Sequence, residues 1–209
     1  MMTQLVVFGG SGFVGQALCQ EAIKQNIPVI SISKHGQPKK SDLWMSHPLI
    51  TWIKMDIFRD DSWKKYLTDS TVCINLIGIL FENKRKGLTY EKMIVRANRL
   101  IISDTARKNI PYIFLSAKGG PKGYVNAKKE AEKDILEKRN PSTIIRSGLI
   151  VDHKFSFRYA QGLAVRLGNK LPLISEEANK VYPTSLDHLV HTILNEARNP
   201  QYKIIEDIR

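Results

Sequence analysis

Two polar residues in the second half of the chain have the types and the spacing for acid–base work. Tyr124 and Lys128 are four positions apart, so on a helix their side chains point to the same face. An ammonium group beside a phenol lowers the phenol pKa from ~10 toward the working pH. The pair could therefore donate a proton to a carbonyl oxygen or remove one from an alcohol.

A glycine-rich segment near the N-terminus has the form of a phosphate-binding turn. Its glycines are spaced by three residues, directly after the apolar run 5–8 and at the start of an expected helix. A tight turn needs residues without a Cβ, and backbone N–H groups at a helix N-terminus attract the pyrophosphate of a dinucleotide. The alternative is a glycine turn without a ligand. The residues expected to contact a dinucleotide are Gly9, Ser11, Gly12, Phe13, Val14 and Gly15.

The residues after the next two expected strands bear on which dinucleotide binds. NAD(H) sites usually place an Asp or Glu after the second strand to bind the ribose hydroxyls. This chain has Ser33 and Lys34 there, and the next acid is Asp42. A lysine suits the 2′-phosphate of NADP(H), so we favour NADP(H) over NAD(H) and keep NAD(H) as the alternative. Asp56 and Ile57, just past the third expected strand, are where an adenine edge would be contacted, and Asp56 could also cap a helix.

Expected strands and helices alternate along the chain, and they must position these residues. Short, uninterrupted apolar runs predict strands buried on both faces, and segments with helical spacing of apolar residues separate them. Such alternation predicts right-handed βαβ units and therefore an α/β fold with a doubly wound parallel sheet between two layers of helices. We expect strands near 5–8, 28–33, 50–55, 71–77, 112–116, 143–146 and 202–205, and helices after the glycine loop and near 61–68, 90–108, 124–138, 156–168 and 186–197.

The length indicates a single domain over residues 1–209 with a small C-terminal cap. A chain of 209 residues buries enough surface for one full core and too little for two domains of ordinary size. The spacing becomes irregular at about 152–182, where Phe155, Phe157 and Tyr159 form an apolar set. These side chains either accept a small apolar substrate such as a quinone or only pack the cap.

The charge of the chain favours an acidic partner. Lys and Arg number 32 against 20 Asp and Glu, a formal net charge of +12. The basic residues are dispersed without interleaved aromatic residues, so we expect no nucleic-acid partner, while contact with an anionic membrane surface stays open.

Other patterns exclude a metal site and a membrane span. No Cys or His cluster has metal-ligand spacing, and no apolar run reaches the ~18 residues of a transmembrane helix. The first residues lack the basic start and the cleavage site of a signal peptide. We therefore expect a cytoplasmic protein, with or without peripheral contact with a membrane.

Taken together, the motifs resemble those of short-chain dehydrogenases/reductases of the atypical or extended kind, over nearly the whole chain. The glycine loop resembles the family's nucleotide loop, and Tyr124-x-x-x-Lys128 resembles its catalytic motif. The other matching positions are Asp56, the segment Asn75–Gly78, Asn98, Ser116, the segment Arg146–Ile150 with Ser147 in place of proline, and Pro183–Val190. Within the family, the chain is most similar to the subgroup named for the nucleotide-binding accessory subunit of respiratory complex I. That subgroup also includes a component of the coenzyme Q biosynthesis complex.

The resemblance implies a Rossmann fold and a role for each matching residue. Ser116 would bind and polarise a carbonyl, Tyr124 would move the proton, and Lys128 would also hold the ribose hydroxyls of the cofactor. The short, glycine-rich connection between Ser116 and Tyr124 leaves three interpretations open: an active set, a set that only positions the cofactor, and no role. Further positions implied to line the cofactor are Leu76, Ile77, Gly78, Asn98 and Ser147.

We therefore expect an NAD(P)(H)-binding oxidoreductase or epimerase-like protein. It would transfer hydride to or from a carbonyl or quinone-like substrate. The alternative is a catalytically silent, nucleotide-binding sensor or assembly subunit associated with a respiratory or quinone pathway. The substrate and the oligomeric state do not follow from the residues.

Overall fold

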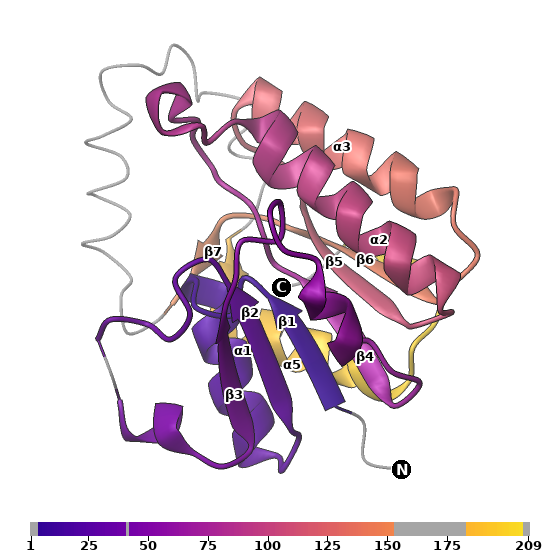
Figure 1. The fold of residues 1–209 in the computed structure, drawn as a ribbon. Coiled ribbons are helices and arrows are strands. Elements are labelled where there is room, and N and C mark those ends of the chain that lie inside the picture. The colour runs from indigo at the N-terminus through magenta and orange to yellow at the C-terminus, as the bar shows by residue number, and fades with distance from the viewer. Residues whose placement is uncertain (1–3, 41, 153–182, 207–209) are drawn as a thin grey trace.

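Seven parallel strands form the central sheet of the computed structural model, which describes residues 4–40, 42–152 and 183–206 (Figure 1). The spatial order of the strands is β3-β2-β1-β4-β5-β6-β9. Their bounds are β1 (Gln4–Phe8), β2 (Val29–Ser33), β3 (Ile50–Lys54), β4 (Thr71–Asn75), β5 (Tyr112–Ala117), β6 (Ser142–Ser147) and β9 (Lys203–Ile205). A separate parallel pair joins β7 (Ile150–Val151) to β8 (Thr184–Ser185). The predicted doubly wound parallel sheet is confirmed.

Two layers of helices enclose this sheet. On one face α1 (Phe13–Lys24) packs beside α5 (Leu186–Arg198), and on the other α2 (Ala97–Arg107) packs beside α3 (Lys122–Leu136) (Figure 1). The shorter elements are the 3-10 turns η1 (Leu43–Ser46), η2 (Ser62–Tyr66) and η3 (Lys84–Lys86), and the π-helical turn η4 (Glu91–Arg96), which leads into α2.

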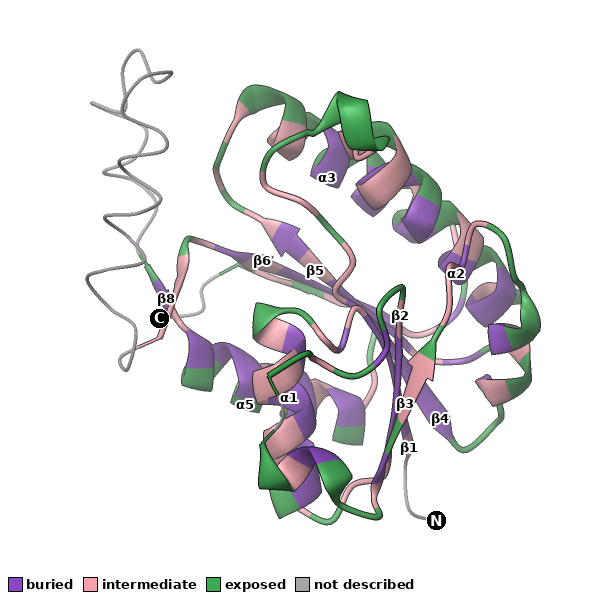
Figure 2. Cartoon of the chain, turned by 60° about the vertical axis from the view of Figure 1, so that its left-hand side comes forward, coloured by how far each residue is buried: buried purple, intermediate pink, exposed green. Residues whose placement is uncertain are grey.

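Successive residues of β1 face different helix layers, as a strand covered on both sides requires. Leu5 and Val7 pack in the core beneath α1 and α5, whereas Val6 and Phe8 pack in the core beneath α2 and α3. Figure 2 shows the burial along the sheet and the inner faces of the helices. The uninterrupted apolar run therefore reflects a strand with two buried faces.

The chain adds strands first on one side of β1 and then on the other, so the sheet has a switch point between β1 and β4. The chain runs from β1 outward through β2 to β3 and then returns to β4 on the other side of β1. The connection after β1 enters α1 on one face, and the connection after β4 leads to α2 on the other face. Open parallel sheets bind ligands at such a switch point, beyond the carboxyl ends of the strands.

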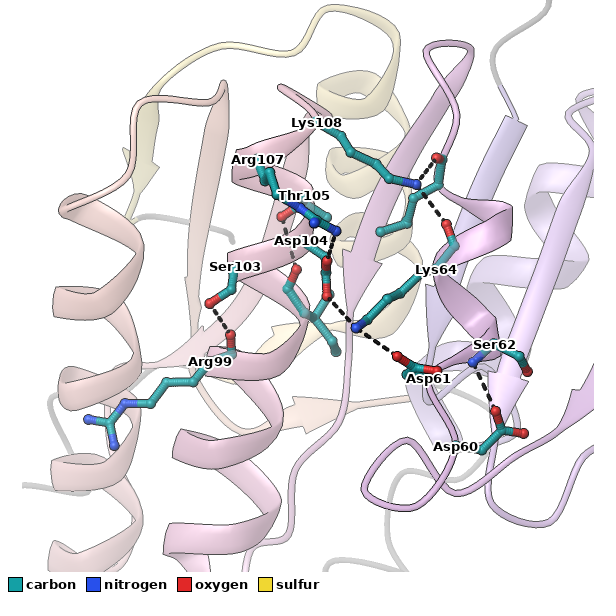
Figure 3. A network of polar contacts seen from close by, with 12 residues as sticks. Asp60, Asp61, Ser62, Lys64, Arg99, Ser103, Asp104, Thr105, Arg107 and Lys108 are labelled. Atoms are coloured by element: carbon teal, nitrogen blue, oxygen red, sulfur yellow. Dashed lines mark hydrogen bonds and ion pairs between the residues drawn. The ribbon is translucent and has the colours of Figure 1, made fainter.

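A cluster of ion pairs joins α2 to η2 near the amino ends of β4 and β5, opposite the switch point (Figure 3). Lys64 Nζ lies 3.0 Å from a carboxylate oxygen of Asp61 and 3.5 Å from one of Asp104, and Arg107 pairs with Asp104 at 2.5 Å. Lys108 Nζ also donates to the carbonyl oxygen of Lys64 at 2.8 Å. Because η2 and the end of α2 each precede the start of a strand, this cluster stabilises the fold away from the switch point.

Two expected helices differ in form from the prediction. The segment near 61–68 contains a single 3-10 turn, and the long helix near 90–108 begins as a π-helical turn before α2. The cap expected at about 152–182 and the helix near 156–168 lie outside the described residues, apart from Asp152. None of the helices in the described ranges is long and apolar enough to cross a membrane.

Candidate functional site

The glycine loop after β1 is packed so closely that Gly9 and Gly15 have no room for a side chain. Gly9 has φ +87°, and a Cβ there would lie 3.1 Å from the carbonyl carbon of Leu76. A Cβ on Gly15 would lie 2.5 Å from the Cα of Gly10 and 2.5 Å from the Gly9 oxygen. The first contact places the loop against the end of β4, and the second lets α1 approach β1 closely.

The first turn of α1 faces this loop without a side-chain cap. Gly12 is the N-cap residue and makes no side-chain hydrogen bond, while its own N–H donates to the Gly9 oxygen at 3.0 Å. Phe13, the first helical residue, is 51 % exposed. The N–H groups of an uncapped first turn can bind a phosphate, as predicted for this loop.

The residues expected at the adenosine end of a dinucleotide lie together. Ser11 Oγ donates to Ser33 Oγ at 2.7 Å, so the glycine loop contacts the end of β2. Lys34 Nζ lies 3.5 Å from a carboxylate oxygen of Asp56, which joins the ends of β2 and β3. Asp56 also accepts the N–H of Phe58 at 3.2 Å, so it stabilises the turn after β3 as well. These contacts bring three of the chain's predicted cofactor segments to one corner of the sheet.

The segment after β4 lies between the glycine loop and α3. Leu76 and Ile77 adjoin Gly9, and Lys128 Nζ lies 3.5 Å from the position that a Cβ on Gly78 would take. A side chain at position 78 would therefore contact the ammonium group of Lys128. The side chain of Ile57, by contrast, is buried in the core, so a ligand there would meet its backbone.

Lys128 is buried beside the ends of β4 and β5. Its Nζ donates to the carbonyl oxygen of Leu115 at 2.6 Å and lies 4.5 Å from the ring centroid of Phe114. Burial lowers the pKa of Lys128 to about 7, against the opposing effect of the Glu132 carboxylate. A buried amine with a pKa near neutrality is a common feature of functional sites.

Tyr124 lies one helical turn before Lys128 and stacks at an angle on Tyr90. The two tyrosine ring centroids are 6.1 Å apart, and Lys128 Nζ lies 5.8 Å from the Tyr124 ring. Burial and the neighbouring Tyr90 raise the pKa of Tyr124 to about 12, so the phenol is protonated at neutral pH. Within the described ranges, no residue forms a hydrogen bond with the Tyr124 hydroxyl.

Ser116 is hydrogen-bonded to a buried carboxylate. Its Oγ donates to Glu132 Oε1, and Arg146 Nη2 donates to Glu132 Oε2 at 2.6 Å. Ser116 is only 1 % exposed. Ser147 lies alongside, and its Oγ donates to the carbonyl oxygen of Ser116 at 3.4 Å. The structure therefore brings Tyr124 and Lys128 together, and it joins Ser116 to Ser147 and to Glu132, which no sequence motif indicated.

Asn98 lies behind the site rather than at its surface. Its side chain is fully buried, accepts the hydroxyl of Tyr112 at 2.8 Å and donates to the carbonyl oxygen of Ala131 at 3.1 Å. Asn75 extends this chain of contacts by donating to the Tyr112 hydroxyl at 2.8 Å. The resulting network fixes α2 and α3 relative to β4 and β5, and a contact between Asn98 and a cofactor stays a prediction.

Glu132 belongs to this site, although no sequence motif indicated it. It follows Lys128 by four positions, so the spacing that joins Tyr124 to Lys128 extends one turn further to Glu132. An acid at this position on an inner helix face is a recognisable signal for a buried ion pair. In the parts of the chain that the structure describes, no group of three His, Cys, Asp or Glu side chains is arranged to hold a metal ion.

A glycine loop at the switch point, with the Tyr124 and Lys128 helix beside it, defines a Rossmann protein of the short-chain dehydrogenase/reductase class. The chain belongs to the NAD dependent epimerase/dehydratase family, whose profile matches residues 5–135. The family resemblance inferred from the motifs is thereby confirmed.

Solved structures have the same fold at low sequence identity. UDP-glucuronic acid 4-epimerase of Bacillus cereus, in complex with UDP-4-deoxy-4-fluoro-glucuronic acid and NAD, has a TM-score of 0.72 and 16 % identity, over 98 % of this chain and 77 % of that one. WbmH of Bordetella bronchiseptica, in complex with NAD+, has a TM-score of 0.73 and 9 % identity, over 99 % of this chain and 75 % of that one. Both comparisons support the Rossmann architecture.

Curated relatives are more similar in sequence. MIOREX complex component 2 of Saccharomyces cerevisiae is 27 % identical, over 97 % of this chain and 96 % of that protein. An uncharacterized chloroplastic protein of Arabidopsis thaliana is 29 % identical over 87 % of this chain, which spans 60 % of that protein. The mitochondrial NADH dehydrogenase [ubiquinone] 1 alpha subcomplex subunit 9 of the same plant is 24 % identical over 85 % of this chain, which spans 46 % of that protein. The last relative supports the predicted likeness to the accessory-subunit subgroup.

Proposed function

We propose that this protein is an NAD(P)(H)-dependent oxidoreductase of the epimerase/dehydratase family, acting on a carbonyl or quinone-like substrate. The observation that carries the proposal is a continuous series of contacts at the switch point. Gly9 abuts the segment Leu76–Gly78, and Gly78 in turn leaves room for the amine of Lys128. A dinucleotide laid along this series would extend from the glycine loop to the Tyr124 helix.

The cofactor that we favour is NADP(H). Ser33 and Lys34 stand where NAD(H) sites usually carry an acid, and Lys34 is exposed at the end of β2. The Lys34 ammonium lies 3.5 Å from a carboxylate oxygen of Asp56, and a 2′-phosphate would be a further anionic partner for it. NAD(H) is the alternative, because both solved neighbours described above hold NAD.

The chemistry that we propose falls on Tyr124 and Lys128. A bound nicotinamide would supply or accept the hydride at the carbonyl carbon. Tyr124, protonated in the free protein because its pKa is raised to about 12, would donate its proton to the carbonyl oxygen during reduction. Protonated Lys128 would stabilise the phenolate left behind and hold the ribose hydroxyls. In the oxidation direction, the phenolate would take the proton from the alcohol.

A second candidate function is a catalytically silent, nucleotide-binding subunit. The observation that favours it is the hydrogen bond of Ser116, whose hydroxyl donates to the carboxylate of Glu132. Ser116 would have to turn from that carboxylate before it could donate to a substrate. The yeast and mitochondrial relatives are, by name, components of larger assemblies.

The other partners that we propose are a small substrate and an anionic membrane surface. A short hairpin, Asn83–Leu88, is closed by a two-residue bridge and presents three exposed cations at its tip, Lys84, Arg85 and Lys86. A cytoplasmic location remains a prediction, and the names of the two Arabidopsis relatives assign those proteins to the chloroplast and the mitochondrion.

The test is a fluorescence titration with NADPH and NADH, followed by turnover on a panel of carbonyl compounds and quinones. We expect NADPH to bind with a Kd well below the millimolar range, and Tyr124→Phe to bind NADPH normally but lose ~100-fold or more in turnover. Tyr90→Phe is the matched control, because it removes a hydroxyl from the ring packed on Tyr124. Failure of both dinucleotides to bind would overturn the proposal. Binding without turnover by the wild type on the whole panel would favour the silent subunit.

A further inference from the structure

The inner face of α3 continues one turn beyond the predicted pair. Tyr124, Lys128 and Glu132 are spaced by four residues each and lie on the side of α3 that faces β5 and β6. Glu132 is only 4 % exposed. A buried carboxylate needs both charge compensation and hydrogen bonds, so its partners identify what it does.

The charge of Glu132 is compensated by Arg146 of β6. Arg146 Nε lies 3.1 Å from Oε1, and Nη2 lies 2.6 Å from Oε2, which is the two-pronged geometry of a strong arginine–carboxylate pair. Ser116 and Arg146 are directly paired positions of β5 and β6. This register places both side chains within reach of Glu132. Glu132 therefore lies over two neighbouring strands and binds the side chain presented by each.

Two successive residues of α3's inner face hold two successive residues of β5. Lys128 Nζ binds the carbonyl oxygen of Leu115, and Glu132 binds the hydroxyl of Ser116. Among the described residues, Tyr124 and Glu132 of α3 are the ionisable neighbours of the Lys128 amine. Arg146 of β6 is paired with Glu132 and also with the exposed Glu206. Glu132 is thus the carboxylate on this face that favours the charged form of the lysine.

We propose that Glu132, with Arg146 as its counter-ion, is the positioning residue of the site: it anchors Ser116 and favours the charged form of the Lys128 amine, which an anionic dinucleotide would bind. This inference rests on the proposed function for the identity of the ligand. The Ser116 and Lys128 contacts to which it refers are present in the free protein.

The experiment compares Glu132→Gln with a matched control on the same helix, Glu130→Gln. Glu130 also forms an ion pair with an arginine, Arg99 at 2.7 Å, but on the exposed side of α3. The first readout is the titration of the Lys128 side chain in the free protein by NMR, assigned with Lys128→Arg. We expect Glu132→Gln to lower the titration midpoint of Lys128 by on the order of one pH unit, and Glu130→Gln to leave it unchanged. Glu132→Asp, which keeps the charge, should restore most of the midpoint.

The second readout is the pH dependence of NADPH affinity in the same variants. Binding that prefers the charged amine weakens as pH rises above the pKa of Lys128 in the free protein, which is about 7. In Glu132→Gln the weakening should begin at lower pH. If this variant does not fold, Glu132→Gln combined with Arg146→Met leaves no uncompensated buried charge and should shift the midpoint in the same direction.

The outcomes separate the two proposals. An unchanged Lys128 midpoint in Glu132→Gln, or an equal shift in Glu130→Gln, overturns the positioning role whatever NADPH does. A shifted midpoint in a wild-type protein that binds neither NADPH nor NADH overturns the proposed function and leaves the electrostatic coupling of Glu132 to Lys128 standing. A shifted midpoint together with a shifted binding profile supports both.

Discussion

Lys128 destabilises the free protein because its amine is buried. The proposed dinucleotide site uses the same buried amine. Its pKa of about 7 lies below the ordinary 10.5, so between these values the unfolded chain carries a proton that the folded protein lacks. The free energy of unfolding therefore rises as pH increases from about 7 to 10.5. Below pH 7 the protein bears the full free-energy cost of burying the charged amine.

The prediction is that Lys128→Met stabilises the protein and weakens cofactor binding. At pH 6.5 the variant should gain on the order of 2 kcal/mol in free energy of unfolding, because an apolar chain of similar size replaces a buried cation. The gain should shrink as pH rises toward 10, whereas NADPH affinity should fall at every pH. Denaturant unfolding at several pH values measures the first effect and fluorescence titration the second. Lys129→Met, an exposed neighbour, is the control, and an equal gain there would contradict the explanation.

Lys34 is the residue on which the choice of cofactor depends. We expect Lys34→Ala to weaken NADPH binding about tenfold and to leave NADH binding within about twofold, because only NADPH carries the 2′-phosphate. Lys24→Ala, which removes an exposed cation at the far end of α1, should change neither. Equal losses for both dinucleotides would show that Lys34 contributes only general electrostatic attraction.

For single residues, the sequence indicates candidates that belong to short local motifs and misses residues that are joined by tertiary contacts. The glycines, Tyr124 and Lys128 belong to short spacings that one element or one turn can explain. The engagement of Ser116 depends on the pairing of β5 with β6 and on the rotation of α3, and neither is encoded in a short spacing. Asn98 matched a motif position, yet its contacts with Tyr112 and Ala131 place it behind the site.

Among the elements, the glycine loop is where backbone packing and binding are most directly coupled. Gly15→Ala would place a methyl group 2.5 Å from the Cα of Gly10, so we expect a loss of about 1–3 kcal/mol in stability and a marked loss of NADPH affinity. Gly87→Ala is the matched control: Gly87 has φ +65° with nothing within 4 Å of a Cβ. That variant should lose about 1 kcal/mol through backbone strain and bind NADPH normally. Normal NADPH binding by a folded Gly15→Ala protein would argue against the loop as the cofactor site.

The elements themselves were predictable where burial on two faces imposes a composition. Runs such as Leu5–Phe8 and Ile113–Leu115 lie in strands with helices on both sides, and the parallel order follows from their alternation with helices. The short and irregular elements were less predictable. The π-helical turn at Glu91–Arg96 continues directly into α2, and its apolar spacing does not distinguish it from an ordinary first turn.

For the whole molecule, the net charge of +12 exceeds what a dinucleotide site accounts for. Lys34 and Lys128 lie at the proposed cofactor path, and several other cations are paired within the fold, as Arg99 is with Glu130 and Asp134. The basic hairpin Asn83–Leu88 gathers three exposed cations, of which Lys84 lies 4.0 Å from Glu82, and it follows the exposed Phe81 in the sequence. It precedes η4 and Tyr90, so it lies at the same edge of the sheet as Tyr124.

We therefore expect the basic hairpin to be the part of the described surface that meets an anionic bilayer. Co-sedimentation with phosphatidylcholine vesicles containing phosphatidylserine should show binding at low salt that is lost at about 0.3 M salt, because exposed charges are then screened. Replacing Lys84, Arg85 and Lys86 by alanine should weaken that binding by on the order of a hundredfold, since each cation near the surface contributes about 1 kcal/mol. The same substitution of Lys133, Lys138 and Arg139, at the other end of α3, removes equal charge from the opposite edge of the sheet. An equal loss in this control would assign the attraction to net charge alone, and vesicle binding that salt leaves unchanged would exclude an electrostatic contact.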